Sequence, residues 1–418
     1  MPGGGGAPAT PRPAWFEEVR RFVRFVAAEL KPRRPLATPF NLISIPVMAV
    51  GVVLIVIRFA RGLESVTNLT QESPWGFWIG FDVVTGVAFA GGAYLVTFAV
   101  YVMKAERYRP IVRATVLNGF LAYVFYAGAL LLDLGRPWRI VNPIIGNSFG
   151  YNSILFLVAW HFMLYMIAEF IEFSPVVAEW LGWRRAQHIL RKLTLVTVIF
   201  GVTLSTLHQS GLGALFLLAK SKIHPLWYSE FLPVLFLVSS VFAGLSMVIF
   251  EGTISPRVFR DRVNRAHNAT FDEIVVGLAR GAAVTLFLYL FFKALVFVHG
   301  KHWVYLGDAW GWWYLLEVVA FVLVPCLMFA RGVRLRELSL IRAAAVVTLA
   351  GIALNRLNVS VIAFNWRSAN PYVPSWMELV ITAAVIFAEI WVFRWVVTRM
   401  PVLHSTPFRL VDKDRQAA

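Results

Sequence analysis

The chain has 418 residues, of which 59% are hydrophobic and 15% charged, and its mean hydropathy is +0.68. This composition excludes an ordinary soluble domain. The formal net charge of +16 does not indicate nucleic-acid binding, because the basic residues are spread over many short segments and no nucleic-acid motif accompanies them. We therefore expect a membrane protein with no nucleic-acid partner.

The first 39 residues form the longest polar segment. They open with the glycine- and proline-rich "MPGGGGAPATPRP" and continue as "AWFEEVRRFVRFVAAEL", a pattern typical of an amphipathic, mostly basic helix. Such a helix is expected to lie on an anionic membrane surface. The segment lacks the successive regions and cleavage site of a signal peptide. We predict a cytoplasmic arm over 1–39, a transmembrane domain over 40–400 and a cytoplasmic tail over 401–418.

Apolar runs long enough to cross a bilayer recur along the rest of the chain. They predict ten transmembrane helices joined by short loops, at 40–60, 77–103, 111–132, 152–173, 190–208, 230–251, 272–298, 310–330, 337–355 and 376–398. The expected fold is an all-α, polytopic membrane protein.

Lysine and arginine are unevenly divided between the two predicted faces. If the N-terminus is cytoplasmic, 27 of the 39 fall in or beside cytoplasmic segments and nine fall at the opposite loops. By the positive-inside rule, this bias predicts that both termini are cytoplasmic.

Tryptophan is concentrated on the opposite, outer face. Ten of the sixteen fall there: Trp75, Trp78, Trp138, Trp227, Trp303, Trp310, Trp312, Trp313, Trp366 and Trp376. An interfacial aromatic belt accounts for most of them. A belt should serve both faces, however, so a docking surface for a partner protein is a second interpretation.

The stretch "LLLDLGRPWRIVNP" (130–143) places an acid and two arginines at the outer end of the third span. A carboxylate at a helix C-terminus opposes the helix dipole. Arg136 is close enough in sequence to pair with Asp133. The pair is either a staple that fixes the loop or the border of a polar pocket.

Further ionisable side chains fall within the outer half of the spans. Each charge in hydrocarbon costs roughly 2.5–3.5 kcal/mol on insertion scales, so such residues usually face the protein interior and mark a functional route. The members of this set are Asp82, His161, His208, Lys293 and Glu317. One of them alone could be a structural polar group, but five beside Asp133 predict a site.

A second set lies deeper in the spans and comprises Glu169, Glu172, Glu251 and Glu389. Glu169 and Glu172 share a helical face, because they are three residues apart. Neighbouring carboxyls that share protons suit a proton relay. Salt bridges between helices and at helix ends are the alternative interpretation.

A pocket open to lipid, with hydrogen-bond donors and exchangeable protons, fits the needs of a quinone. A b-type haem is a rival, but it needs two histidines at matched depth, and His208 is expected roughly 10 Å shallower than His161. A secondary transporter is another, but no internal repeat is found. A single cysteine, Cys326, cannot ligate an iron–sulfur cluster. No metal site is expected, and the electrons must come from another chain.

The "DLGRPWR" loop is similar to the signature loop of the NrfD-type family, the membrane subunits of polysulfide reductase and its relatives. Other stretches more closely resemble one branch, the HybB-like membrane subunit of periplasmic nickel–iron uptake hydrogenases. They are "PWGFWIGFD" (74–82), "HQSGLGALFLLAKSKIHPLW" (208–227), "MVIFEGT" (247–253), "RLNVSVIAFN" (356–365) and "PSWMELVI" (374–381). The resemblance extends over about residues 40–403.

This resemblance implies packed helix bundles without haem, in the inner membrane of a bacterium, with menaquinone or ubiquinone bound toward the periplasm. It implies a periplasmic ferredoxin-like iron–sulfur subunit as the partner, carrying electrons from the large and small subunits of a hydrogenase. A molybdenum enzyme, a multihaem cytochrome or a sulfur-respiration complex would use a similar subunit. Proton movement would accompany the electron transfer.

Carried over by position, the quinone-site residues are Asp82, Tyr123, Asp133, Arg136, His208 and Gln209. The expected proton relay is His161, Glu169, Glu172, Glu251 and Glu389. In one respect the chain departs from the hydrogenase branch, which carries a glutamate early in the fourth span where this sequence has Leu157. Glu169, Glu172 or His161 is the expected substitute.

Overall fold

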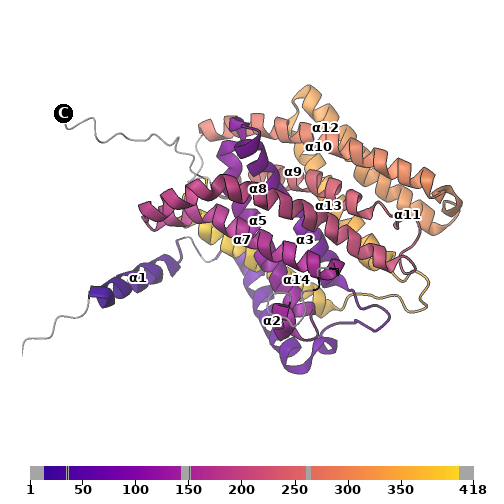
Figure 1. The fold of residues 1–418 in the computed structure, drawn as a ribbon, viewed down its shortest axis with the longest axis horizontal. Coiled ribbons are helices and arrows are strands. Elements are labelled where there is room, and N and C mark those ends of the chain that lie inside the picture. Colours follow the sequence, from indigo (N-terminus) through magenta and orange to yellow (C-terminus); the bar gives the residue numbers. More distant parts are fainter. Residues whose placement is uncertain are drawn as a thin grey trace, which may run out of the picture. The chain divides into compact units, whose positions relative to one another are not determined.

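The computed structural model describes residues 14–33, 35, 37–142, 150, 152–259 and 265–403 (Figure 1). The glycine-rich opening and the predicted tail beyond residue 403 lie outside these residues. The chain divides into two units, Met1–Ile45 and Pro46–Ala418.

The first unit contains the helix predicted for the N-terminal arm, α1 (Ala14–Leu30). Apolar side chains such as Val19, Val23 and Leu30 are exposed on it. A salt bridge of 2.6 Å between Arg33 and Glu29 follows at its C-terminal end. Attachment of α1 to a membrane surface stays a prediction.

Ten helices in the described residues are long and apolar enough to cross a membrane, which confirms the predicted number and order. The first span is α2 (Pro39–Arg61), and the second comprises η2 (Trp78–Val83), α3 (Val84–Phe89), α4 (Gly92–Thr97) and η3 (Phe98–Val102). The third comprises η4 (Glu106–Ile111) and α5 (Val112–Asp133). The fourth is α7 (Ile154–Trp180), and the fifth is α8 (Arg184–Leu215) with η6 (Phe216–Ala219). The sixth span is α9 (Leu232–Val258), and the seventh is α10 (Arg265–His299). The eighth comprises α11 (Ala309–Val318), η8 (Val319–Leu323) and α12 (Val324–Leu335). The ninth is α13 (Leu338–Leu357) with η9 (Asn358–Ile362), and the tenth is α14 (Trp376–Arg399). The short helices η1 (Leu63–Ser65), η5 (Pro137–Val141) and η7 (His302–Tyr305) lie in the loops after the first, third and seventh spans.

The fifth span extends well beyond its predicted end at residue 208, because α8 continues as a helix to Leu215. The glycines of "HQSGLGAL" do not end it, since apolar residues on both sides keep one face packed. His208 therefore lies about two turns inside the helix rather than at the membrane edge. The depth difference expected between His208 and His161 was wrong.

Four segments of the spans are π-helical, namely η2, η3, η8 and η9. Each holds a residue in excess of the α-helical repeat, which changes the direction of the side chains on either side. Such segments are frequent at functional positions. Asp82 lies in η2 and Asn358 in η9, while η8 begins two residues after Glu317.

The spans of the second unit form two groups of four. The second to fifth spans pack as one ring, in which α5 contacts α4 and α7, and α7 lies along α8 (Figure 1). The sixth to ninth form the other, in which α9 contacts α10 and α13, and α12 contacts both. The tenth, α14, packs against α5.

The two rings meet where α9 crosses α3, α4 and α8. At this crossing the backbones touch, because a Cβ atom on Gly244 would lie 2.2 Å from the backbone nitrogen of Gly92. Small residues commonly permit such close helix contacts inside membranes. A side chain at position 244 would force the rings apart.

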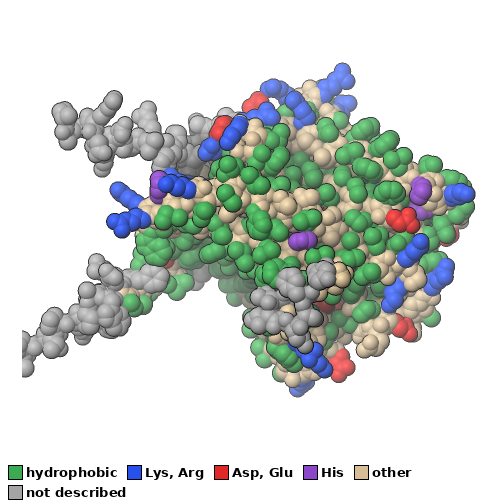
Figure 2. Space-filling view, in the orientation of Figure 1, with side chains coloured by type: hydrophobic (Ala, Val, Ile, Leu, Met, Phe, Trp, Pro, Cys, Tyr) green, Lys and Arg blue, Asp and Glu red, His purple; other side chains and the backbone are tan. Residues whose placement is uncertain are grey.

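Large apolar side chains cover much of the surface of the second unit. On α2, Val52, Val53, Val56 and Phe59 are 51–60% exposed. Figure 2 shows apolar side chains over most of the face in view, with charged ones mainly near its edges. A surface of this kind suits contact with lipid tails.

Candidate functional site

His208 projects from α8 into the interior of the first ring and is 1% exposed. Its Nδ1 lies 3.2 Å from the carbonyl oxygen of Val158 on α7. Because a carbonyl only accepts, Nδ1 carries the hydrogen and Nε2 holds the lone pair. Tyr123 and Phe162 flank the imidazole, with ring centroids at 5.8 and 5.3 Å.

Several buried polar atoms around His208 have no hydrogen-bond partner among the described residues. They are His208 Nε2, the Tyr123 and Ser205 hydroxyls, His161 Nδ1 and Glu169 Oε2. The two hydroxyls face each other without forming a hydrogen bond of normal geometry. Since buried polar groups are nearly always satisfied, this concentration between α5, α7 and α8 marks a place where a polar ligand or water completes the site.

A line of polar side chains runs from this point along one face of α7. The hydroxyl of Tyr165 donates to Glu169 Oε1 over 2.5 Å. Glu172 follows one turn farther along. Glycines on the facing helices make room for both carboxyls, because a Cβ atom would lie 2.6 Å from Glu169 Oε1 at Gly119 and 3.1 Å from Glu172 Oε1 at Gly201. His161, which is within electrostatic reach of His208, occupies the outer end of the same face.

A second polar cluster, the outer cluster, forms on the predicted outer side, where the first and third spans end and the second and tenth begin. The Thr382 hydroxyl donates to Asp82 Oδ2 over 2.9 Å. Arg58, which is 2% exposed, donates to the carbonyl oxygens of Leu132 and Leu134 over 2.6 and 2.5 Å. Its guanidinium thus satisfies carbonyls that the end of α5 leaves open, and it lies within electrostatic reach of Asp133.

The ion pair expected between Asp133 and Arg136 is absent from the described contacts, and Arg58 takes its place beside Asp133. The backbone turns extended at Leu134, which ends α5 and carries Arg136 outward, where it is exposed. One carboxyl oxygen of Asp133, Oδ1, is buried without a partner among the described residues. Arg58 was not found from the sequence, because it lies 75 residues before Asp133.

Glu378 is a further buried carboxylate that the sequence interpretation missed; it is 1% exposed. It accepts from the Tyr372 hydroxyl and from the backbone nitrogen of Ser375, the latter over 2.8 Å. Ser375 and Glu378 form a capping box at the start of α14. The serine-x-x-glutamate pattern before an apolar run was the signal in the sequence.

The side chain of Gln209 forms a hydrogen bond that joins two helices. Its side-chain nitrogen donates to the carbonyl oxygen of Val87 over 2.8 Å and ties α8 to α3. It stands beside His208 in the sequence but points to a different helix.

The "HPLW" stretch folds into a cap of aromatic side chains between the fifth and sixth spans. His224 is fully buried among Trp227, Trp310 and Trp366, whose ring centroids lie 4.5–5.6 Å away. Burial lowers the pKa of His224 and keeps it neutral. Several of the outer tryptophans thus fill this cap, whereas Trp138 and Trp312 are about 70% exposed.

Glu317 is the centre of a saturated polar network in the second ring. Its carboxylate accepts from Trp227 over 2.6 Å and from Asn355 over 2.7 Å, and also from Asn358. Lys293 Nζ lies 3.7 Å from it. Nearby, Arg356 donates to Ser239 over 2.7 Å and stacks 3.5 Å above the Phe236 ring.

Glu251 and Glu389 lie apart from the α7 line, and the structure places both within electrostatic reach of Tyr126. In the described part of the chain, no group of three or more His, Cys, Asp or Glu residues is placed to hold a metal ion.

Ten packed helices with buried polar centres define the class of protein as a multi-pass helical membrane protein. The model of the NrfD family, described as "Polysulphide reductase, NrfD", matches residues 65–366, so the chain belongs to this family.

Two relatives are similar over nearly the whole length, and a third over about three quarters of this chain. A protein of Nitratidesulfovibrio vulgaris is 43% identical over 376 residues, 90% of this chain and 97% of its own. The probable Ni/Fe-hydrogenase 2 b-type cytochrome subunit of Escherichia coli is 33% identical over 388 residues, which cover 90% of this chain and 97% of that subunit. The integral membrane subunit of menaquinone reductase from N. vulgaris is 26% identical over 360 residues, which cover 76% of this chain and 80% of that subunit. The chain is thus a membrane subunit related to those of hydrogenase and menaquinone reductase.

The Glu317 network makes a prediction about stability. Replacing Glu317 by Gln leaves Lys293 without a buried counter-charge, which should lower the free energy of unfolding by about 3–5 kcal/mol. The double variant Glu317→Gln, Lys293→Met should recover much of this loss, because the pair is then removed as a whole. Unfolding in mild detergent, followed by tryptophan fluorescence, measures both.

Glu230→Gln is the matched control, since Glu230 pairs with Lys220 over 3.8 Å on the surface and both are well exposed. Its loss should cost no more than about 1 kcal/mol. Equal stability of Glu317→Gln and Glu230→Gln would contradict the role assigned to the network.

Proposed function

We propose that this chain is the quinone-binding membrane subunit of a respiratory oxidoreductase complex in the bacterial inner membrane. The single observation that carries the proposal is the group of unpartnered polar atoms around His208, buried in the outer half of the first ring. Membership of the NrfD family supports it. The menaquinone reductase subunit among the relatives supports it as well.

The residues present suit a quinone as substrate. A quinone carbonyl oxygen accepts hydrogen bonds, and the Tyr123 and Ser205 hydroxyls are donors without another partner among the described residues. His208 is fixed by Val158 with Nε2 directed away from that contact, so it is oriented to exchange a proton with the same ligand. Asp82, Asp133 and Arg136 belong to the neighbouring outer cluster and its loop, and Gln209 holds α8 in place. With both termini cytoplasmic, the quinone site faces the periplasm.

The name of the Escherichia coli relative mentions a b-type cytochrome. In this structure Tyr123 and Phe162 pack beside the His208 ring, and His208 Nδ1 lies 3.2 Å from the carbonyl oxygen of Val158. That this chain holds no haem stays a prediction from its sequence, and no step of the proposed function uses a haem.

Quinone binding is testable on the purified chain. A fluorescent hydroxyquinoline N-oxide, which mimics a quinone headgroup, should bind and be quenched. His208→Ala should weaken this binding about tenfold or more, since a buried hydrogen bond worth about 1–3 kcal/mol is lost. Tyr123→Phe should have a similar effect.

His188→Ala is the matched control, because His188 is exposed at the opposite end of α8. It should bind the probe as the original chain does. Unchanged affinity in both site variants would refute the assignment of the site.

We propose that His161, Tyr165, Glu169 and Glu172 exchange protons with this site. The contacts that support the relay are the Tyr165–Glu169 hydrogen bond and the shared α7 face. A buried carboxyl that loses its proton-transfer capacity should slow turnover by about a hundredfold or more. Quinone-linked turnover of the intact complex, measured with Glu169→Gln and Glu172→Gln, tests the relay.

Glu179→Gln is the control on the same helix, since Glu179 is part of a salt bridge with Arg113 at the helix end. Normal turnover in both Glu169→Gln and Glu172→Gln would refute the proposed relay.

We further propose that the electrons come from a periplasmic ferredoxin-like iron–sulfur subunit and the large and small subunits of a nickel–iron hydrogenase. The 33% identity to the hydrogenase subunit supports this choice of partner. Purification in mild detergent should therefore retain nickel and iron–sulfur clusters with this chain. Molybdenum, or many haems, would instead assign the subunit to one of the alternative complexes.

A further inference from the structure

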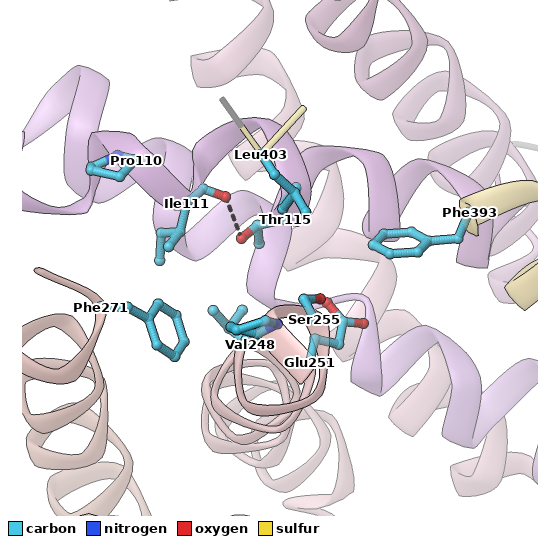
Figure 3. Close-up of a pocket in the computed structure, with 12 residues that line it drawn as sticks. Pro110, Ile111, Thr115, Val248, Glu251, Ser255, Phe271, Phe393 and Leu403 are labelled. Carbon is cyan, nitrogen blue, oxygen red and sulfur yellow. Dashed lines mark hydrogen bonds between the residues drawn. The ribbon is translucent and has the colours of Figure 1, made fainter. Parts of the chain in front are cut away.

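The seventh span, on α10, turns one face toward the protein and the opposite face away from it. Figure 3 shows Phe271, at the start of this span, pointing into a pocket toward Ile111 and Val248 of neighbouring elements. Arg280 follows nine residues later, which is two and a half turns of an α-helix. The side chain of Arg280 therefore leaves α10 on the side opposite to Phe271, and it is exposed.

The surface around Arg280 is apolar. Val284, Phe287 and Phe291 continue the same helical face at intervals of three or four residues and are 53–65% exposed. A face of this kind suits contact with lipid tails. Arg280 makes no hydrogen bond or ion pair with any residue that the structure describes. Its positive charge thus stands on the lipid-facing side of the helix without a counter-charge from the described chain.

Arg280 also lies well inside the span. Glu273 of α10 pairs with Arg336 over 2.9 Å, and both side chains are about 70% exposed. This ion pair is expected at the boundary between membrane and water, on the predicted cytoplasmic face. Arg280 is seven residues farther along α10, about 10 Å deeper by helix rise. Because the hydrocarbon core is roughly 30 Å thick, the backbone of Arg280 is expected within it.

α12 packs against α10 and runs antiparallel to it. The ion pair just described joins the two segments near the boundary, and Cys326 Sγ lies 3.6 Å from the carbonyl oxygen of Ala283 at a deeper level. Arg331 and Arg334 lie on α12 between these two contacts. They are therefore placed between the level of Arg280 and the boundary.

Arg331 and Arg334 are exposed and share a face of α12 with Leu327, which is 59% exposed. Neither arginine makes a hydrogen bond or ion pair within the described part of the chain. The carboxylate of Glu273 at this end is already paired with Arg336. The guanidiniums of two packed helices thus lead from the apolar surface to the boundary, and long arginine side chains can extend toward it while their stems cover apolar surface.

We propose that Arg280, Arg331 and Arg334 form a binding site for the headgroup phosphate of an anionic phospholipid, in the leaflet on the predicted cytoplasmic face. A guanidinium binds phosphate oxygens through paired, charge-assisted hydrogen bonds. The acyl chains of the same lipid lie along Val284 and Phe287, so one molecule meets both the charge and the apolar surface. Basic positions between membrane helices on this side are suited to anionic headgroups. The site is independent of the proposed quinone site.

A carboxylate on a membrane helix of another subunit would also neutralise Arg280. A phospholipid is the better match because the two shallower arginines lie toward the boundary, where the headgroup phosphates of a membrane are found. A single carboxylate at the level of Arg280 would leave both of them without a counter-charge.

Binding is tested on the purified full-length chain in a neutral detergent. Dioleoyl phosphatidylglycerol should raise the unfolding temperature, because a ligand that binds only the folded state stabilises it. Dioleoyl phosphatidylcholine has the same chains and a phosphate but no net charge, and it should have much less effect. Arg280→Gln should weaken phosphatidylglycerol binding about tenfold, read from the lipid concentration at half of the maximal shift. Arg280→Lys, which keeps the charge without the paired donors, should give an intermediate affinity.

Arg184→Gln is the matched control, because Arg184 is exposed at the start of α8, in the other ring and on the same predicted face. It should bind phosphatidylglycerol as the original chain does. Equal stabilisation by the two lipids, or an unchanged affinity in Arg280→Gln, would overturn the proposal.

The occupant of the site in the membrane is identified with a photocrosslinking residue in place of Val284 in the intact complex. It should capture anionic phospholipids at several times their share of the membrane lipid, as measured by mass spectrometry. The same residue in place of Phe200, which is 49% exposed on α8, is the control and should capture lipids in proportion to the membrane composition. Capture of another polypeptide at position 284, or of lipids without preference, would refute the site.

Discussion

A charged or strongly polar side chain within an apolar span must find its partner inside the protein, because lipid tails offer none. This constraint determines how the spans of the second unit are arranged. Arg58 on the first span is satisfied by carbonyls at the end of the third. Asp82 on the second is satisfied by Thr382 on the tenth. Each polar group thus fixes a contact between spans that are distant in the chain, while the apolar surface is left to the lipid.

The two rings of helices meet this constraint in different ways. In the second ring Glu317 is saturated by donors from four segments, and such a network stabilises a single arrangement. In the first ring, polar atoms of Tyr123, Ser205 and His208 are buried without partners among the described residues. A saturated network is structural, whereas an unsatisfied one costs stability that only a ligand, water or proton can recover. Single unpartnered atoms also occur in the second ring, for example at Ser246 and Arg356, and the denser group around His208 supports our proposal that the quinone binds in the first ring.

The number and order of the spans could be predicted because each is long and apolar, a signal contained within one segment. Asp82, Asp133 and His208 could be found because they interrupt such segments. Their partners could not, since Arg58, Thr382 and Glu378 come from remote parts of the chain. The depth of His208 was misjudged because its helix continues through two glycines. The π-helical segments leave no simple trace in the sequence, since one extra residue per turn does not change the overall apolar pattern.

The outer cluster also constrains how the protein is made. Trp78 and Asn68, near the start of the second span, contact Glu378 at the start of the tenth, some 300 residues later. A ribosome that has inserted the early spans has not yet supplied these partners. Until the tenth span emerges, the carboxyl of Asp82 must be tolerated by lipid, water or the insertion machinery, because its partner Thr382 lies on α14. Insertion of the tenth span is therefore the event that completes this cluster.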